Sequence, residues 1–140
     1  MNVRILVGID GSQRFAPVVD AAAKLATDEH GELIIVYAVD WRPIAEEAEA
    51  AGGPITGTPI DPDALIQGLE AEGRTFLAQA AQRATHDGVA ATHELYTGNP
   101  VDVLLTVARD ERCASIVVGE GHVARELLHR ASIPVHVVAH

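Results

Sequence analysis

Cysteine and long apolar runs are scarce in this chain of 140 residues, and each shortage excludes a class of protein. The single cysteine, Cys113, has no partner for an intramolecular disulfide, which favours a reducing, cytoplasmic location. No apolar run approaches the ~20 residues that a membrane-spanning helix requires. The first apolar stretch ends at Asp10, too early for a secretory leader. We therefore expect a cytoplasmic protein with no membrane insertion.

Basic residues are also few. The formal net charge is −10, and among the ten Lys and Arg residues only Lys24 is a lysine. Binding to nucleic acid or to an anionic membrane needs clustered basic side chains that neutralise phosphates. We therefore expect no nucleic-acid partner. The acidic, lysine-poor composition suits a salt-loving organism and a GC-rich genome alike.

Five apolar stretches predict the strands of one domain, residues 1–140. They lie at 3–9, 33–39, 91–97, 116–118 and 135–138. The first two are nearly continuous, which is typical of strands buried on both faces, whereas 91–97 alternates as an edge strand does. Residues 41–60 are rich in proline and glycine and are expected to form a long connection, with a helical turn at 46–49 as an option.

Between these stretches, apolar residues recur at the spacing of helix faces. The four stripes are Phe15, Val18, Val19, Ala22, Leu25 and Ala26; Leu65, Leu69, Phe76, Leu77, Ala80 and Ala84; Val101, Leu104, Leu105 and Ala108; and Val123, Leu127, Leu128 and Ala131. Gly31 is expected to end the first helix, while Asp61-Pro62 and Asn99-Pro100 are expected to begin the second and third. Five strands alternating with four helices predict an α/β fold, a single open, doubly wound parallel sheet.

Three stretches resemble the universal stress protein family in the same order along the chain. They are ILVGIDGS at 5–12, YTGNPVDVLLTVARDERCASIVVG at 96–119 and LLHRASIPVHVV at 127–138. The resemblance implies strand order 3-2-1-4-5 and a homodimer. An apolar edge strand is prone to association, so the strand expected to pair with its twin is the last one, Val135, His136, Val137 and Val138.

Many members of this family bind ATP through Gly-x2-Gly-x9-Gly-Ser/Thr, where backbone N–H groups and a helix N-terminus meet the phosphates. Here Gly119 matches the first glycine, Gly121 stands for the second or the third, and His122 occupies the Ser/Thr position. The residues between them are absent. Glu120 adds a carboxylate that repels a triphosphate. The comparison with the family pattern thus predicts a truncated loop and no tight ATP binding.

The resemblance places a residual adenosine pocket, able to take AMP or adenosine weakly, at the other end of this site. Its residues are Gly8, Ile9, Asp10, Ala38 and Val39, joined by Gly119 and Gly121. Asp10 has two interpretations, a contact to the ribose or adenine edge and an ordinary turn residue. The two glycines of the shortened loop either border a ligand or only turn the chain.

Catalytic and metal-binding patterns are missing from the sequence. There is no Gly-x-Ser-x-Gly elbow, Walker loop or Gly-x-Gly-x-x-Gly after a strand, so we expect no enzyme. The third strand ends in Tyr96-Thr97-Gly98, without the acids of a phosphoacceptor domain. The histidine pairs lack zinc spacing, namely His122 with His129 and His136 with His140.

These patterns lead to one preferred function and one alternative. We expect no cofactor and no metal. The preferred function is a dimeric regulatory or binding protein with an unknown protein partner and no tight ATP binding. The alternative is a nucleotide-binding stress-response module that still takes ATP or AMP. A nucleotide hydrolase would require a nucleophile or base that no motif supplies.

Overall fold

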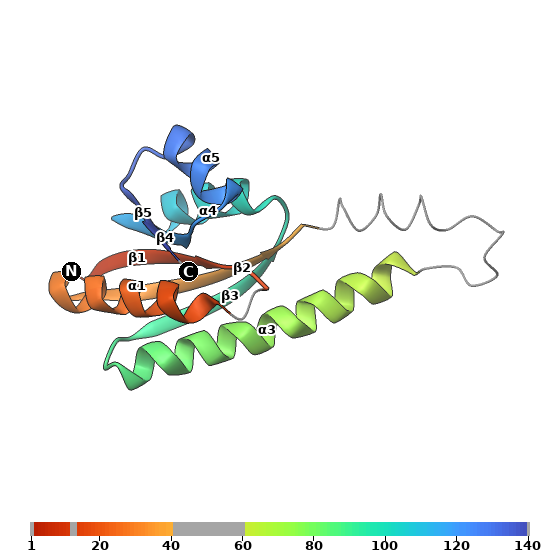
Figure 1. Ribbon diagram of the computed structural model, residues 1–140, viewed down its shortest axis with the longest axis horizontal. Helices are drawn as coiled ribbons and strands as arrows, with labels where there is room; N and C mark the ends of the chain where they lie inside the picture. Colours follow the sequence, from red (N-terminus) through yellow and green to blue (C-terminus); the bar gives the residue numbers. More distant parts are fainter. Residues whose placement is uncertain (1, 12–13, 41–60, 140) are drawn as a thin grey trace.

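A computed structural model describes residues 2–11, 14–40 and 61–139, and its centre is one parallel sheet (Figure 1). The strands follow the order β3-β2-β1-β4-β5, and every neighbouring pair is parallel. Their bounds are β1 (Val3–Ile9), β2 (Gly31–Val39), β3 (Ala91–Thr97), β4 (Ser115–Gly119) and β5 (Val135–Val138). The predicted doubly wound fold and strand order are confirmed. The expected connection at 41–60 and its helical turn at 46–49 lie outside the described residues.

The helices of the described chain cover both faces of this sheet (Figure 1). α1 (Phe15–Glu29) and α3 (Pro62–His86) pack on one face, and α4 (Pro100–Asp110) and α5 (His122–Arg130) pack on the other. Neighbouring strand residues point to opposite faces, so Ile5 and Val7 join the α1/α3 core while Leu6 joins the α4/α5 core. Among the described residues, no helix combines the length and apolar character needed to cross a membrane.

The predicted caps of α3 and α4 are confirmed. The Asp61 side chain accepts a hydrogen bond from the backbone N–H of Asp63, and proline follows at the first helical position. The Oδ1 atom of Asn99 accepts from the N–H groups of Val101 and Asp102, at 3.0 and 3.2 Å. Each side chain satisfies donors that an uncapped helix would leave without an intrahelical partner.

The predicted end of the first helix is wrong by one residue. His30, not Gly31, takes the left-handed conformation with φ 55°, and its N–H bonds to the carbonyls of Ala26 and Thr27. Gly31 instead opens β2, where an added Cβ would lie 2.7 Å from the carbonyl oxygen of Val3. The glycine is therefore needed for the close approach of two strands rather than for a helix cap.

Two of the predicted helical stripes include leucines that the structure leaves in solvent. Leu65 is 47% exposed and Leu128 is 59% exposed. Leu65 lies in the first turns of α3, which extend past the sheet (Figure 1). Ala131, the last member of the fourth stripe, follows α5 as its cap residue. Helical spacing selects a face, but it does not tell where along the helix the sheet ends.

Candidate functional site

A cavity of about 210 Å³ lies at the carboxyl ends of β1, β2 and β4. It opens where the sheet order reverses, because the chain passes from β1 outward to β2 and later from β4 outward to β5. Such a switch point is where open α/β sheets hold their ligands. Its walls come from three strands and two helices: Gly8, Ile9, Asp10, Val36, Ala38, Pro100, Leu104, Val118, Gly119, His122 and Val123.

The floor of the cavity depends on a residue without a side chain. An added Cβ at Gly8 would lie 3.0 Å from Cδ1 of Leu104 and 3.1 Å from Cγ1 of Val118. Both neighbours are almost fully buried in the α4/α5 core. Glycine therefore lets α4 approach the sheet closely while the space above β1 stays open.

The polar side chains of the cavity stand at its rim. Asp10 follows the last residue of β1, and His122 is the first residue of α5; both side chains are exposed. Gly121 precedes the helix at φ 149°, a conformation that favours glycine, and it supplies no side-chain cap. The N-terminus of α5 thus differs from that of α4, whose first N–H groups bond to Asn99.

One backbone donor of the turn between β4 and α5 is already used within the sheet. The backbone N–H of Glu120 donates to the carbonyl oxygen of Val138 at 3.0 Å, and it therefore continues the β4–β5 ladder. The side chain of Glu120 is exposed. A donor already held by a strand carbonyl is not available to a phosphate without breaking that bond.

The structure brings together most of the residues that the sequence singled out. Gly8, Ile9, Asp10, Ala38 and Gly119 all line the cavity. Val39, in contrast, is 4% exposed and packs in the α1/α3 core on the other face of the sheet. Gly121 is exposed beside the cavity, and its neighbour His122 supplies the lining.

Sequence reasoning did not place four apolar walls and one proline at this site, namely Val36, Leu104, Val118, Val123 and Pro100. Two of them carried a usable signal. Val36 lies two residues before Ala38, and Val118 lies two residues after Ile116. Because strand side chains alternate between the two faces, the members of each pair lie on the same face of the sheet. The helix walls depend on how α4 and α5 cross the sheet, which spacing does not reveal.

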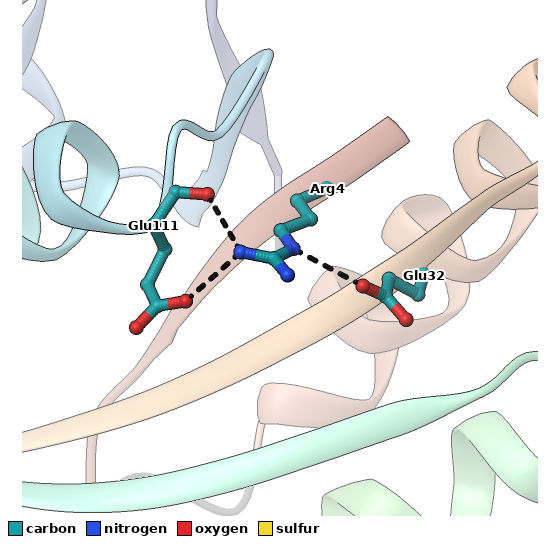
Figure 2. A network of polar contacts seen from close by, with 3 residues as sticks. All are labelled: Arg4, Glu32 and Glu111. Atoms are coloured by element: carbon teal, nitrogen blue, oxygen red, sulfur yellow. Dashed lines mark hydrogen bonds and ion pairs between the residues drawn. The ribbon is translucent and has the colours of Figure 1, made fainter. Parts of the chain in front are cut away.

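A second hollow, of about 640 Å³ and widely open, lies at the amino ends of β1 and β2. Its central side chain is Arg4, whose Nε donates to Oε1 of Glu32 at 3.2 Å (Figure 2). The Nη1 atom of Arg4 donates to Oε2 of Glu111 at 3.1 Å and to its main-chain carbonyl at 3.2 Å. Within the described part of the chain, no cluster of His, Cys, Asp or Glu could hold a metal ion.

The fold and the cavity together define a class, an open parallel α/β domain with a small, mostly apolar cavity at its switch point. Comparison with known proteins identifies the family within this class. The chain belongs to the universal stress protein family, whose model matches residues 1–139.

Relatives span nearly the full fold. Universal stress protein YxiE of Bacillus subtilis (strain 168) is 31% identical over 120 residues, which cover 83% of this chain and 77% of that protein. A crystal structure of a family protein from Burkholderia pseudomallei is 35% identical with a TM-score of 0.78, covering 96% of this chain and 94% of its own. The universal stress protein of Archaeoglobus fulgidus in complex with dAMP is 21% identical, with a TM-score of 0.71 over 97% of each chain.

Proposed function

We propose that this protein is a universal-stress-type regulatory protein that works by binding rather than by turnover, and that it does not bind ATP tightly. The observation that carries the proposal is the cavity with its short β4–α5 turn. Pockets for drug-sized ligands occupy roughly 300–1,000 Å³. A cavity of about 210 Å³ is smaller than this range and suits one ring system rather than a whole nucleoside triphosphate.

The energetics of a triphosphate at this turn are unfavourable. The N–H of Glu120 is held by Val138, and its carboxylate would stand close to the phosphates. The dipole at the N-terminus of α5 contributes only about 0.3–1 kcal/mol at an exposed position. Losing several charge-assisted hydrogen bonds, each about 1.5–3 kcal/mol, outweighs that contribution and lowers affinity by orders of magnitude.

The second candidate function is a nucleotide-binding module that takes AMP or adenosine weakly. Two observations favour it. The cavity gathers Gly8, Asp10 and Ala38, and the A. fulgidus relative of the same fold is a complex with dAMP. Asp10 would accept from the ribose hydroxyls, while the apolar walls would contact the base.

Calorimetric titration separates these candidates. We expect no heat with MgATP and weak heat with AMP. Low-micromolar affinity for MgATP, or ATP retained through purification, would contradict the truncated-loop proposal. A phosphate-release assay tests turnover, and steady release above the protein-free rate would overturn a binding role.

A loop graft tests the cause. A Gly-x2-Gly-x9-Gly-Ser segment placed between Val118 and Val123 should create ATP binding in a folded variant, because it supplies the missing donors. The matched control is Glu120→Ser in the unmodified turn. If this single change already produces ATP binding, charge rather than loop length is the cause.

We also propose that the protein acts as a homodimer through β5. This strand is an edge of the sheet, and Val137 on it is 43% exposed. The carbonyls of Pro134 and Val138 accept from β4, so alternation turns the N–H of Val137 to the open edge. Pairing with the same strand of a second copy would satisfy these edge groups.

Light scattering tests the dimer. The unmodified protein should be dimeric at micromolar concentration, and Val137→Pro should yield monomer or aggregate because it removes an edge donor without touching the β4 ladder. Val137→Ala keeps the N–H and should remain dimeric. A monomer at high micromolar concentration would overturn this assembly.

A further inference from the structure

A tyrosine behind the sheet reaches the turn that carries Asp10. Tyr37 lies on β2 in register with Ile9 of β1, and its side chain joins the α1/α3 core, on the face opposite the cavity. Its hydroxyl extends past the end of β1, since an added Cβ on Gly11 would lie 2.9 Å from the hydroxyl oxygen. The phenol therefore touches the chain directly after Asp10.

The ring of Tyr37 packs against α3, and α1 supports that contact from behind. It stacks on Phe76 of α3 with ring centroids 6.5 Å apart and planes 20° apart, and Phe76 meets Phe15 of α1 edge to face at 6.0 Å. Gly73 brings α3 close, because an added Cβ there would lie 2.8 Å from Cδ1 of Tyr37. Packing against α3, which Phe15 of α1 backs through Phe76, thus fixes where the hydroxyl stands.

The electrostatics keep this hydroxyl neutral. Burial raises the pKa of Tyr37, and the negative charges of Glu72 and Asp10 raise it further. Tyr37 as a whole residue is 7% exposed, and its phenol stays protonated at physiological pH. Because the Tyr37 hydroxyl is neutral, it can support the Asp10–Gly11 turn from behind without adding a second charge that would act on a bound ligand alongside Asp10.

We propose that Tyr37 is a positioning residue for the candidate site: from the far face of the sheet its hydroxyl supports the Asp10–Gly11 turn and holds Asp10 at the cavity rim. This inference rests on the proposed weak binding of AMP. It assigns to α3, which does not touch the cavity, a share in setting the geometry of the site. Tyr37 itself makes no contact with the ligand in this arrangement.

The first test measures AMP affinity by NMR titration in a double-mutant cycle. Tyr37→Phe keeps the stacked ring and removes only the hydroxyl that lies against Gly11, so we expect affinity to fall modestly, about two- to tenfold. In an Asp10→Ala background the same change should have no further effect, because Tyr37 acts through Asp10. Equal losses in both backgrounds would overturn the inference. Tyr96→Phe, the other tyrosine of the chain, is the matched control and should leave affinity unchanged.

The second test needs no ligand. The backbone order parameter of Gly11, from ¹⁵N relaxation, should fall in Tyr37→Phe and stay constant in Tyr96→Phe. An unchanged Gly11 in Tyr37→Phe would overturn the inference even if AMP binds. Absence of AMP binding to the unmodified protein would instead overturn the proposed binding, so the two failures are distinguishable.

Discussion

The two ends of the same sheet have opposite characters. At the carboxyl ends, a cavity of about 210 Å³ has mostly apolar walls, with Asp10 and His122 at its rim. At the amino ends, a hollow of about 640 Å³ is lined mostly by charged side chains, and Arg4 at its centre pairs with Glu32 and Glu111 (Figure 2). The larger space thus has at its centre an arginine that already binds two carboxylates of the chain.

This difference follows from how parallel strands and helices meet. Helix N-termini and glycine-rich turns come to the carboxyl ends, where backbone can approach a ligand. Helix C-termini come to the amino ends, where Arg4 joins β2 to the residue that follows α4. The contrast indicates that apolar walls with a few rim groups, rather than volume or charge, mark the candidate site.

The largest expected effect on stability comes from truncating a side chain that belongs to both the cavity wall and the core. Leu104 is 3% exposed and touches the floor above Gly8, so Leu104→Ala should lower the free energy of unfolding by about 2–5 kcal/mol. Urea denaturation measures this. The half-buried Leu105→Ala should cost less. If the two changes cost the same, Leu104 is not the tighter contact and the cavity wall collapses freely.

The next effect concerns the capped helix at the carboxyl end. Asn99→Ala removes the acceptor for two N–H groups and should cost about 1 kcal/mol of stability. Asn99→Asp keeps a capping oxygen and serves as the control. Thermal melts with and without AMP provide the measurement. A change in AMP affinity at unchanged stability would assign Asn99 to ligand binding instead of capping.

A smaller effect is expected at the amino end. Arg4 is 45% exposed, so Arg4→Met should cost less than about 1 kcal/mol and the cost should shrink in high salt. Denaturation at two salt concentrations tests this. Arg109→Met is the control, because that side chain is 77% exposed and pairs only with its neighbour Asp110 among the described contacts. A loss at Arg4 well above this range would make the network a main determinant of stability.

The smallest effect should be the very slow reaction of the Cys113 thiol, which lies next to this network. Cys113 is 6% exposed, and burial, aided by the charge of Glu111, raises its pKa to about 11. At pH 8 the group is therefore almost entirely thiol, which is a poor nucleophile. A thiol reagent should label native protein very slowly and urea-unfolded protein fast. Rapid labelling of the native state would show that the amino end opens readily.

Much of the fold could be predicted because its strands are apolar stretches of strand length with clear boundaries. The predicted bounds 3–9, 91–97 and 135–138 coincide with β1, β3 and β5. Continuous apolar runs leave little ambiguity between strand and helix when glycine, proline or charged residues surround them. The caps at Asp61 and Asn99 were equally readable, since each pairs a short acceptor with a proline.

The errors share a physical cause, which is distance along the chain. Gly31 resembled a helix stop, yet its role depends on the carbonyl of Val3 in another strand. Leu65 and Leu128 have helical spacing, yet their exposure depends on where neighbouring elements end. The residues close in sequence to Gly31, Leu65 and Leu128 do not reveal which distant segments pack beside them.

For the site, the sequence by itself determined which residues reach the carboxyl edge, because Gly8 is next to last in β1, Asp10 follows that strand and Gly119 ends β4. Parallel pairing then brings those ends to one side of the sheet. Only the tertiary structure decided that α4 closes the cavity with Leu104 and that Tyr37 stands behind Asp10. The reason is that helix crossing and side-chain interdigitation arise from packing between distant segments, which periodicity within one segment does not encode.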